Sequence, residues 1–195
     1  LDLKVTVDQI KSVYRDDARS WVLGFSGGKD STALLQIVFQ ALEELPRQQL
    51  TKQVHVVSND TLVEIPQVSK MVTNVLGKIE KMARQTQLPI TVTQTTPELN
   101  NSFFVNVIGR GYPSPNIRFR WCTERMKIDP TSRYIERVVN KSGEVIILLG
   151  ARKSESATRA QVMENHAIEG SILRRHSTLP RCLVFTPIEN FTTDD

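Results

Sequence analysis

The residues most able to do chemistry form one short run that combines backbone flexibility, positive charge and hydroxyl groups. The run is Ser26, Gly27, Gly28, Lys29, Asp30, Ser31 and Thr32. Glycines permit a turn that exposes amide N–H groups, and the N-terminus of a following helix attracts anions. The lysine adds a full charge and the Ser and Thr side chains add donors. We therefore expect all seven residues to bind the phosphates of a nucleotide.

This run differs from the Walker A phosphate loop, which requires a Gly-Lys pair followed at once by Ser or Thr. Here Lys29 stands where that motif needs glycine, and Asp30 separates the lysine from Ser31. An ordinary glycine-rich turn is the alternative interpretation. The six-residue match between an apolar stretch and a helical pattern favours phosphate binding.

A second group of charged residues follows the apolar stretch Glu144–Leu149. Arg152 and Arg159 lie seven positions apart, and a helix that begins at Ser154 would place Arg159 one turn inside it. Two guanidinium groups beside a helix N-terminus can clamp an oxyanion. A solvated basic helix end is the alternative. A place at the end of an expected strand favours a catalytic, ligand-binding role for both arginines.

An acidic residue, Asp60, follows the apolar stretch Gln53–Ser58. A carboxylate at this place can accept a ribose hydroxyl or hold a metal ion. It can equally form an Asx turn with its own backbone, so both interpretations stay open.

Cys122 is surrounded in sequence by basic residues, which are Arg118, Arg120, Arg125 and Lys127. Positive groups that are also close in space lower the pKa of a thiol. Cys122 could therefore carry sulfur or ligate an iron–sulfur cluster, whereas an inert buried cysteine is the alternative. We expect Cys182, which opens an apolar stretch, to be structural. Two cysteines cannot complete a four-thiolate cluster, so a cluster needs ligands from outside this sequence.

The elements that position these residues alternate along the chain. Apolar stretches predict strands at Trp21–Phe25, Gln53–Ser58, Ile90–Thr95, Glu144–Leu149 and Leu183–Pro187, and helical spacing predicts helices at Val5–Arg19, Ser31–Leu45 and Gln67–Gln87. Alternation of this kind indicates an α/β fold, a doubly wound parallel sheet of about five strands with helices on both faces. Ligands bind such sheets at the carboxyl ends of the strands.

Two further segments, Thr96–Ile117 and Phe191–Asp195, have sequences that predict particular structures. Thr96–Ile117 is a long connection rich in Gly and Pro, which is typical of lids and binding segments or of disorder. Phe191–Asp195 has the cap residues and acids of a helix about to begin, so we expect the natural protein to continue beyond it.

Composition excludes several classes of protein. The 195 residues are 39% hydrophobic and 24% charged, which is typical of a globular domain, and no apolar run is long enough to span a membrane. Two cysteines provide no disulfide framework, so a reducing cytoplasm is the expected location. The net charge of +4 is compatible with a nucleotide or nucleic acid partner.

Four segments together resemble the phosphoadenosine-phosphosulfate reductase family. They are SGGKDST from Ser26, DTLVE from Asp60, WCTERMKIDP from Trp121 and GARKSESATRA from Gly150. The first resembles the PP-loop of ATP pyrophosphatases, and an intact PP-loop argues against a true reductase. The third is similar to the paired-cysteine segment of adenylylsulfate reductases, with Trp121 in place of the first cysteine. The combination is most similar to the DndC and SspD group of DNA phosphorothioation ATPases.

That resemblance implies a single PP-loop ATP pyrophosphatase domain over residues 1–195, truncated at its C-terminus. It implies ATP and Mg²⁺ as ligands, with catalytic roles for Lys29, Asp30 and Ser31, and a [4Fe-4S] cluster in the full-length protein with Cys122 as one ligand. It also implies a cysteine desulfurase and other DNA phosphorothioation proteins as partners, DNA as an indirect partner, and no membrane. Two alternatives remain: an adenylyltransferase like the small subunit of ATP sulfurylase, and a non-catalytic ATP-binding module.

Overall fold

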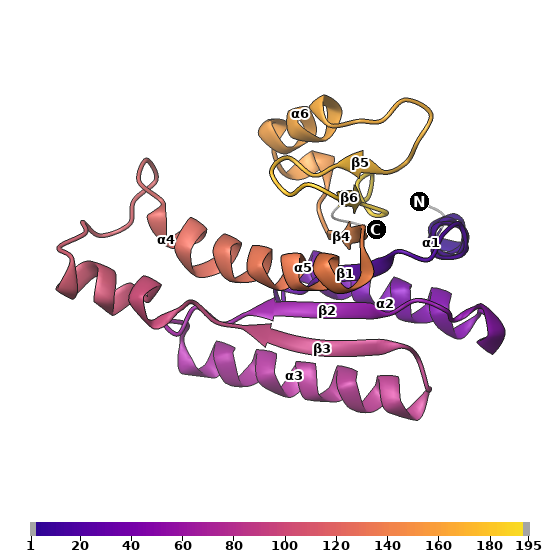
Figure 1. Cartoon of the computed structure of the whole chain (residues 1–195), viewed down its shortest axis with the longest axis horizontal. Helices are drawn as coiled ribbons and strands as arrows, with labels where there is room; N and C mark the ends of the chain where they lie inside the picture. Colours follow the sequence, from indigo (N-terminus) through magenta and orange to yellow (C-terminus); the bar gives the residue numbers. More distant parts are fainter. Residues whose placement is uncertain (1–2, 193–195) are drawn as a thin grey trace.

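The computed structural model describes residues 3–192 and contains one six-stranded sheet (Figure 1). The strand order is β3-β2-β1-β4-β6-β5, and every pairing is parallel except that of β5 with β6. The strands are β1 Ser20–Gly24, β2 Val54–Asn59, β3 Ile90–Thr95, β4 Val145–Leu148, β5 Arg174–Arg175 and β6 Cys182–Phe185.

Residues 3–192 contain six α-helices and several shorter helical turns, and all of them except α1, which precedes β1, lie between strands. The α-helices are α1 Leu3–Arg15, α2 Lys29–Glu43, α3 Pro66–Gln85, α4 Trp121–Thr123, α5 Asp129–Ser142 and α6 Ala157–Asn165. The 3₁₀ turns are η1 Arg47–Gln49, η2 Leu99–Asn101 and η5 Lys153–Glu155, and the π-helical turns are η3 Val105–Gly109 and η4 Glu124–Ile128. Among residues 3–192, no helix is both long and apolar enough to cross a bilayer.

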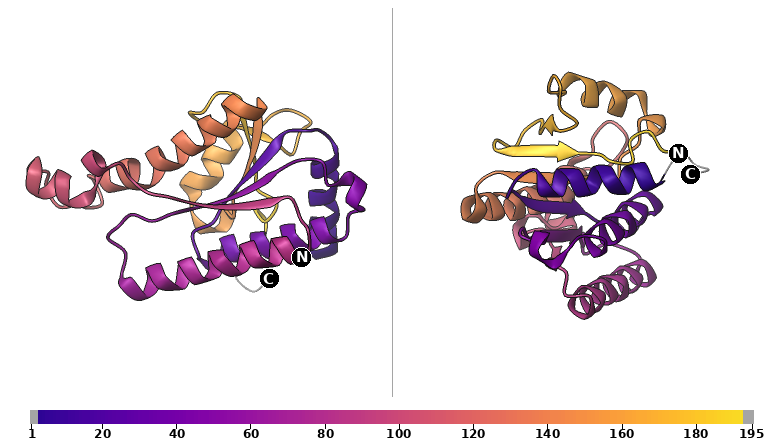
Figure 2. Two further views of the ribbon diagram at one scale, coloured as in Figure 1. Left: turned by 60° about the horizontal axis from the view of Figure 1, so that its bottom comes forward. Right: turned by 90° about the vertical axis from the view of Figure 1, so that its right-hand side faces the viewer.

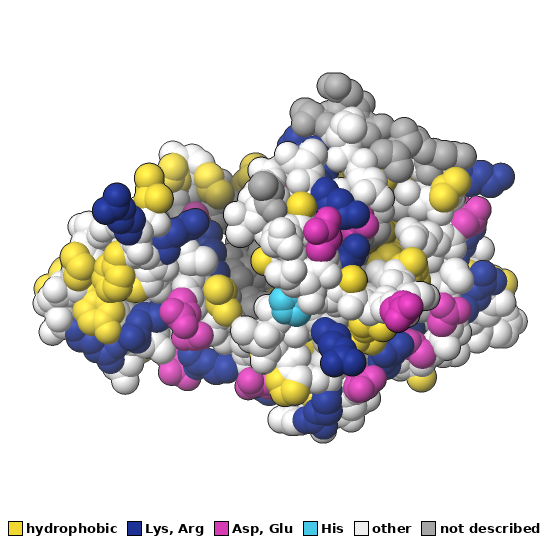
Figure 3. Space-filling view, turned by 90° about the horizontal axis from the view of Figure 1, so that it is seen from above, with side chains coloured by type: hydrophobic (Ala, Val, Ile, Leu, Met, Phe, Trp, Pro, Cys, Tyr) yellow, Lys and Arg dark blue, Asp and Glu magenta, His cyan; other side chains and the backbone are white. Residues whose placement is uncertain are grey.

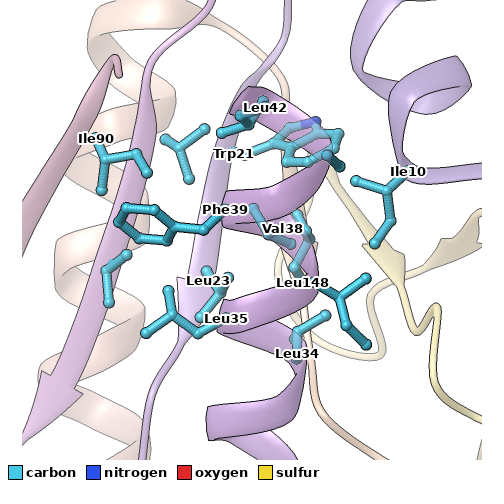
Figure 4. Packing of buried hydrophobic residues seen from close by; sticks show 14 of the residues in the cluster. Ile10, Trp21, Leu23, Leu34, Leu35, Val38, Phe39, Leu42, Ile90 and Leu148 are labelled. Carbon is cyan, nitrogen blue, oxygen red and sulfur yellow. The ribbon is translucent and has the colours of Figure 1, made fainter. Parts of the chain in front are cut away.

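Helices cover both faces of the sheet, which confirms the doubly wound fold. Successive side chains of a strand point to opposite faces. Leu23 of β1 therefore packs in a large core with Leu34 of α2 (Figure 4), whereas Val22 packs in a second core with Ile135 of α5. The first core also receives side chains from α1 and α3. Burial on two faces explains why the central strands are continuously apolar.

Two elements that position the site were not predicted. The two-residue strand β5 pairs at the edge of the sheet and consists of two arginines, so it has no apolar pattern to reveal it. Helix α5 begins at Asp129 with Pro130 in its first turn, and it buries Ile135, Val138 and Val139. That apolar spacing and the early proline are helix signals, and they could have predicted α5.

Residues 99–128 project away from the sheet and are called the arm here (Figure 2). The arm contains η2, η3, α4 and η4, so the expected long loop contains helical turns. Its interior is aromatic: Trp121 is buried, stacks on Phe103 at 5.7 Å and meets the edge of Tyr112 at 5.4 Å. The indole N–H donates to the carbonyl of Pro113 at 3.0 Å. The arm therefore has a small core of its own.

The two cysteines differ in burial. Cys182 lies in the second core opposite Val145, and burial raises the pKa of its thiol. We expect Cys182→Ser to lower the free energy of unfolding by about 1–3 kcal/mol, because a hydroxyl would enter apolar surroundings. Cys122, which is half-buried, provides the matched control, and Cys122→Ser should change stability much less. Urea unfolding of both variants measures this, and equal losses would contradict it.

Candidate functional site

The glycine-rich run forms a closed turn between β1 and α2. Gly27 has a φ of +75°, which favours glycine, and Gly28 is the N-cap of α2. The buried Ser31 hydroxyl donates to the Gly28 carbonyl at 3.0 Å and lies 3.2 Å from the hydroxyl of Ser26. The Thr32 hydroxyl donates to the same carbonyl at 2.8 Å. Ser31 and Thr32 thus brace the turn from inside, and the first turn of α2, which has no side-chain cap, faces the ligand side.

The segment after β4 packs directly on this turn. A Cβ atom at Gly150 would lie 2.7 Å from the carbonyl oxygen of Asp30 and 3.0 Å from the amide nitrogen of Ser31. No side chain fits in that space. The glycine therefore lets the chain beyond β4 lie against the start of α2, so the ends of two neighbouring strands form one surface.

The two arginines expected to form one clamp have different surroundings. Arg152 is only 5% exposed, and its Nε lies 3.1 Å from Oδ1 of Asp30. Arg159 is exposed on α6, pairs with Glu155 and lines the cavity described next, which Arg152 does not reach. The geometry gives Arg152 a positioning role, because it holds the first turn of α2 through Asp30.

A cavity of about 1000 Å³ lies at the carboxyl ends of β1, β2 and β4. One end is polar, and its lining includes Ser26, Gly28, Lys29, Asp30 and Ser31 of the turn. The floor is apolar and is formed by Val57, Ile135, Ile147, Leu149 and Val184. A phosphate end beside an apolar floor suits a nucleotide, whose base is flat and whose phosphates are charged.

The wall opposite the turn was not predicted from the sequence. It includes His166, Arg174 and His176, from α6 to the region around β5. Arg174 contacts Glu189 at 2.7 Å and donates to the Thr186 hydroxyl at 2.8 Å. Burial lowers the pKa of His176, so a neutral imidazole is favoured there. These three residues lie close together in sequence but far from the glycine-rich run, and no motif connects the two regions.

Asp60 lines the cavity and also forms a turn. Its Oδ1 accepts the N–H of Leu62 at 2.8 Å, and Leu62 has a φ of +63°. The geometry of Asp60 therefore agrees both with an Asx turn and with contact to a ligand in the cavity. The preceding Asn59 joins β2 to η4 and α5, because its Oδ1 accepts the Thr131 hydroxyl at 2.9 Å and its amide donates to the Lys127 carbonyl at 3.2 Å.

Cys122 lies outside the large cavity. It lines a neighbouring hollow of about 670 Å³ between the arm and the segment after β2. Glu64 and Lys127 line both spaces, so the two are adjacent. Of the basic residues near Cys122 in sequence, Arg125 is directed elsewhere and donates to Asn101 at 3.0 Å and to the Tyr112 hydroxyl at 3.1 Å.

The residues of this chain do not fit an iron–sulfur cluster by themselves. Over residues 3–192 there is no group of three or more His, Cys, Asp or Glu side chains placed to hold a metal ion. The thiol of Cys182 is buried in the second core, whereas Cys122 lies in the arm. A four-thiolate cluster therefore has no binding site within this part of the chain.

A parallel sheet, a braced glycine turn at a helix N-terminus and a cavity at the strand ends define a nucleotide-binding α/β domain with a PP-loop. Residues 20–195 match the phosphoadenosine phosphosulfate reductase domain. The match covers most of the chain, so this protein belongs to that family.

One curated relative is similar to this chain in sequence. An uncharacterised protein of Methanocaldococcus jannaschii is 29% identical over 157 residues, which are 80% of this chain and 28% of that protein. The chain therefore spans less than a third of that relative.

Three solved structures share the fold at low sequence identity. A U34-tRNA thiolase, NcsA, from Methanococcus maripaludis with its [4Fe-4S] cluster has a TM-score of 0.52 and 12% identity, covering 98% of this chain and 62% of that one. A phosphoadenylyl-sulfate reductase from Candida auris has a TM-score of 0.50 and 15% identity, covering 96% of this chain and 80% of that one. An NH3-dependent NAD synthetase from Campylobacter jejuni has a TM-score of 0.51 and 14% identity, covering 100% of this chain and 70% of that one.

The close packing at Gly150 predicts that a side chain there destabilises the fold, and Gly77 provides a matched control. We expect Gly150→Ala to lower the free energy of unfolding by about 1–3 kcal/mol, because the new methyl group collides with backbone. Gly77→Ala in α3 meets no atom within 4 Å and should be neutral or stabilising by up to about 1 kcal/mol. Urea unfolding distinguishes them, and a neutral Gly150→Ala would show that the segment can shift.

The ionisation of Glu189 makes the stability of the fold depend on pH. Burial opposes its ionisation, but hydrogen bonds from Lys153, Arg174 and Thr186 outweigh burial and lower its pKa. The folded state then binds fewer protons than the unfolded state, so the stabilisation is complete above the ordinary glutamate pKa of about 4.3 and is lost below it. Glu189→Gln should flatten this part of the stability profile below about pH 5. An unchanged slope in the variant would assign the pH dependence to other carboxylates.

Proposed function

We propose that this chain is an ATP pyrophosphatase that cleaves ATP to AMP and pyrophosphate and thereby activates an acceptor for sulfur incorporation. The acceptor we propose is a DNA backbone phosphate, in phosphorothioate modification. The observation that carries the proposal is the braced turn of Ser26–Ser31 at the start of α2, which opens into a cavity with an apolar floor. Membership of the phosphoadenosine phosphosulfate reductase family supports it.

The cavity divides into places for the parts of ATP. The phosphates would lie on the turn, where the amides of the first turn of α2 and the Lys29 ammonium are available. The base would lie over the apolar floor, and Asp60 would accept a ribose hydroxyl at its border. Arg159 would approach the phosphates from α6 after exchanging its pairing with Glu155 for the nucleotide.

The first reaction step is a substitution at the α-phosphorus. An acceptor oxygen forms a bond to this phosphorus, the bond to the oxygen that bridges to the β-phosphorus breaks, and pyrophosphate leaves with the electron pair. Negative charge develops on the leaving group, so the amides of the turn, Lys29 and Arg159 would stabilise it. With water as the acceptor, the products are AMP and pyrophosphate.

Mg²⁺ would enter as part of the nucleotide substrate. Carboxylates of Asp60 and Glu64 border the cavity, while Asp30 is already paired with Arg152. The ion would offset phosphate charge when bound. Ser31 and Asp30 then act mainly by holding the turn in its shape, because both are engaged in bonds within the protein.

Sulfur would reach the activated acceptor in a second step. We propose Cys122 as the carrier, loaded as a persulfide by a cysteine desulfurase, because its hollow adjoins the cavity through Glu64 and Lys127. The outer sulfur would attack the acceptor phosphorus as AMP leaves with the former acceptor oxygen. A first external thiol would then attack the Cys122 sulfur and release the phosphorothioate, and a second thiol would resolve the resulting mixed disulfide and restore the cysteine.

The products of ATP cleavage test the first step. We expect AMP and pyrophosphate rather than ADP and phosphate, because the chain has a PP-loop and no Walker A sequence. Chromatography of the nucleotide products, with and without DNA, measures this. ADP as the main product, or release of pyrophosphate that depends on sulfate, would contradict the proposal.

Substitution of two of the cations that line the cavity, Lys29 and Arg159, tests their role. Lys29→Ala and Arg159→Ala should each reduce pyrophosphate release by about 10²-fold, since each removes a charge that stabilises the leaving group. Both side chains are exposed, so stability should change little. Lys78→Ala, an exposed lysine on α3, is the matched control and should keep full activity. Full activity in either cavity variant would remove that residue from the site.

A further inference from the structure

The arm carries the net charge of the whole protein. Within residues 99–128 the basic residues are Arg110, Arg118, Arg120, Arg125 and Lys127, and the only acid is Glu124. The resulting charge of +4 equals that of the entire chain, so the other 165 residues are electrically balanced together. A charge concentrated on one projecting segment attracts a polyanion much more strongly than the same charge spread over a surface.

The tip of the arm presents this charge together with apolar side chains. The Asn116 side chain accepts the N–H groups of Arg118 at 2.9 Å and Phe119 at 3.0 Å, which closes a tight turn. Ile117 in this turn is 94% exposed and Phe119 is 43% exposed, and Arg118 and Arg120 beside them are exposed as well. The sequence Ile-Arg-Phe-Arg at 117–120 is therefore exposed to solvent, on a turn that the Asn116 side chain closes.

The arm has a packed and hydrogen-bonded interior beneath this exposed surface. Trp121 is buried between Phe103 and Tyr112, and Arg125 bonds to both Asn101 and Tyr112. Arg125 thus serves the interior of the arm, while Arg110, Arg118 and Arg120 remain at its surface. A preorganised surface loses little entropy when it binds a partner.

The arm also leads toward the reaction centre. Figure 3 shows Lys and Arg side chains interspersed with apolar ones over the arm at the left of the view. The hollow that contains Cys122 has one wall from the arm and adjoins the large cavity. A strand bound on the arm could therefore continue through this hollow to the α-phosphate of ATP.

We propose that the arm binds an unpaired segment of a nucleic acid strand and guides its backbone to the cavity. This inference rests on the proposed function, since it names the surface that would hold the acceptor. The arginines would contact phosphates, and Phe119 would stack on a base. An excess of five cations over one anion favours this partner over a protein, whose interfaces combine apolar contact with charges of both signs.

Fluorescence anisotropy tests the role of the arm arginines in binding. It measures the affinity of the chain for a labelled single-stranded oligodeoxynucleotide of about twenty bases. The variant combining Arg110→Ala, Arg118→Ala and Arg120→Ala should bind about tenfold or more weakly, and the slope of log affinity against log salt should fall by about two. The control combines Lys78→Ala, Lys81→Ala and Arg84→Ala on α3, where the residues are equally exposed. It removes the same charge and should change binding little.

Substitutions of Phe119 distinguish aromatic stacking on a base from simple apolar contact. Phe119→Ala and Phe119→Leu should both weaken binding by about tenfold, because leucine keeps apolar surface but has no aromatic face. Near-ultraviolet circular dichroism of the Trp121 stack checks that each variant keeps the arm folded. A duplex of the same sequence should bind more weakly than the single strand.

Several outcomes would overturn the inference. They are absence of oligonucleotide binding by the wild type, equal losses in the arm and α3 triple variants, full binding by Phe119→Leu, or a preference for duplex. The proposed ATP cleavage is tested separately, because the arm variants should release pyrophosphate normally without DNA, and Lys29→Ala should bind the oligonucleotide normally. ATP cleavage without oligonucleotide binding would refute the arm alone, and binding without cleavage would refute the proposed reaction alone.

Discussion

The contact between Gly150 and the backbone of Asp30 is the constraint on which the rest of the site depends. Neighbouring parallel strands β1 and β4 end side by side, and the chain that leaves β4 passes within van der Waals distance of the first turn of α2. Arg152, two residues later, then reaches Asp30 from a buried position. The glycine turn is thus fixed from outside by β4 and from inside by Ser31. Such double support keeps backbone donors in one arrangement before a ligand arrives.

The opposite wall of the cavity is held by a different kind of interaction. Glu189 receives hydrogen bonds from Lys153, Arg174 and Thr186, and these three residues come from η5, β5 and the segment after β6. The turn side combines backbone contact and hydroxyl groups with the Asp30–Arg152 pair. This side is joined through the Glu189 carboxylate, whose pKa is lowered by the hydrogen bonds that it accepts despite its burial.

Charge is divided between the two parts of the molecule. The body of the domain is balanced, and its ion pairs, such as Lys52 with Asp17, stabilise local structure. The arm has unbalanced positive charge above an aromatic interior. In the proposed function, the body would hold the nucleotide while the arm would bind the nucleic acid strand.

The sequence by itself determined the sheet, the glycine turn and the family. Strand Ile90–Thr95 was predicted to the residue and the four other predicted strands to within one or two positions, because apolar runs between helical patterns are local signals. Only the tertiary structure decided which side chains meet. Arg152 and Arg159 are similar in sequence, but packing buries one under the turn and leaves the other at the cavity. Cys122 lies beside the cavity rather than in it, and the wall around β5 has no sequence pattern. Such contacts join residues far apart in the chain, and local periodicity contains no information about them.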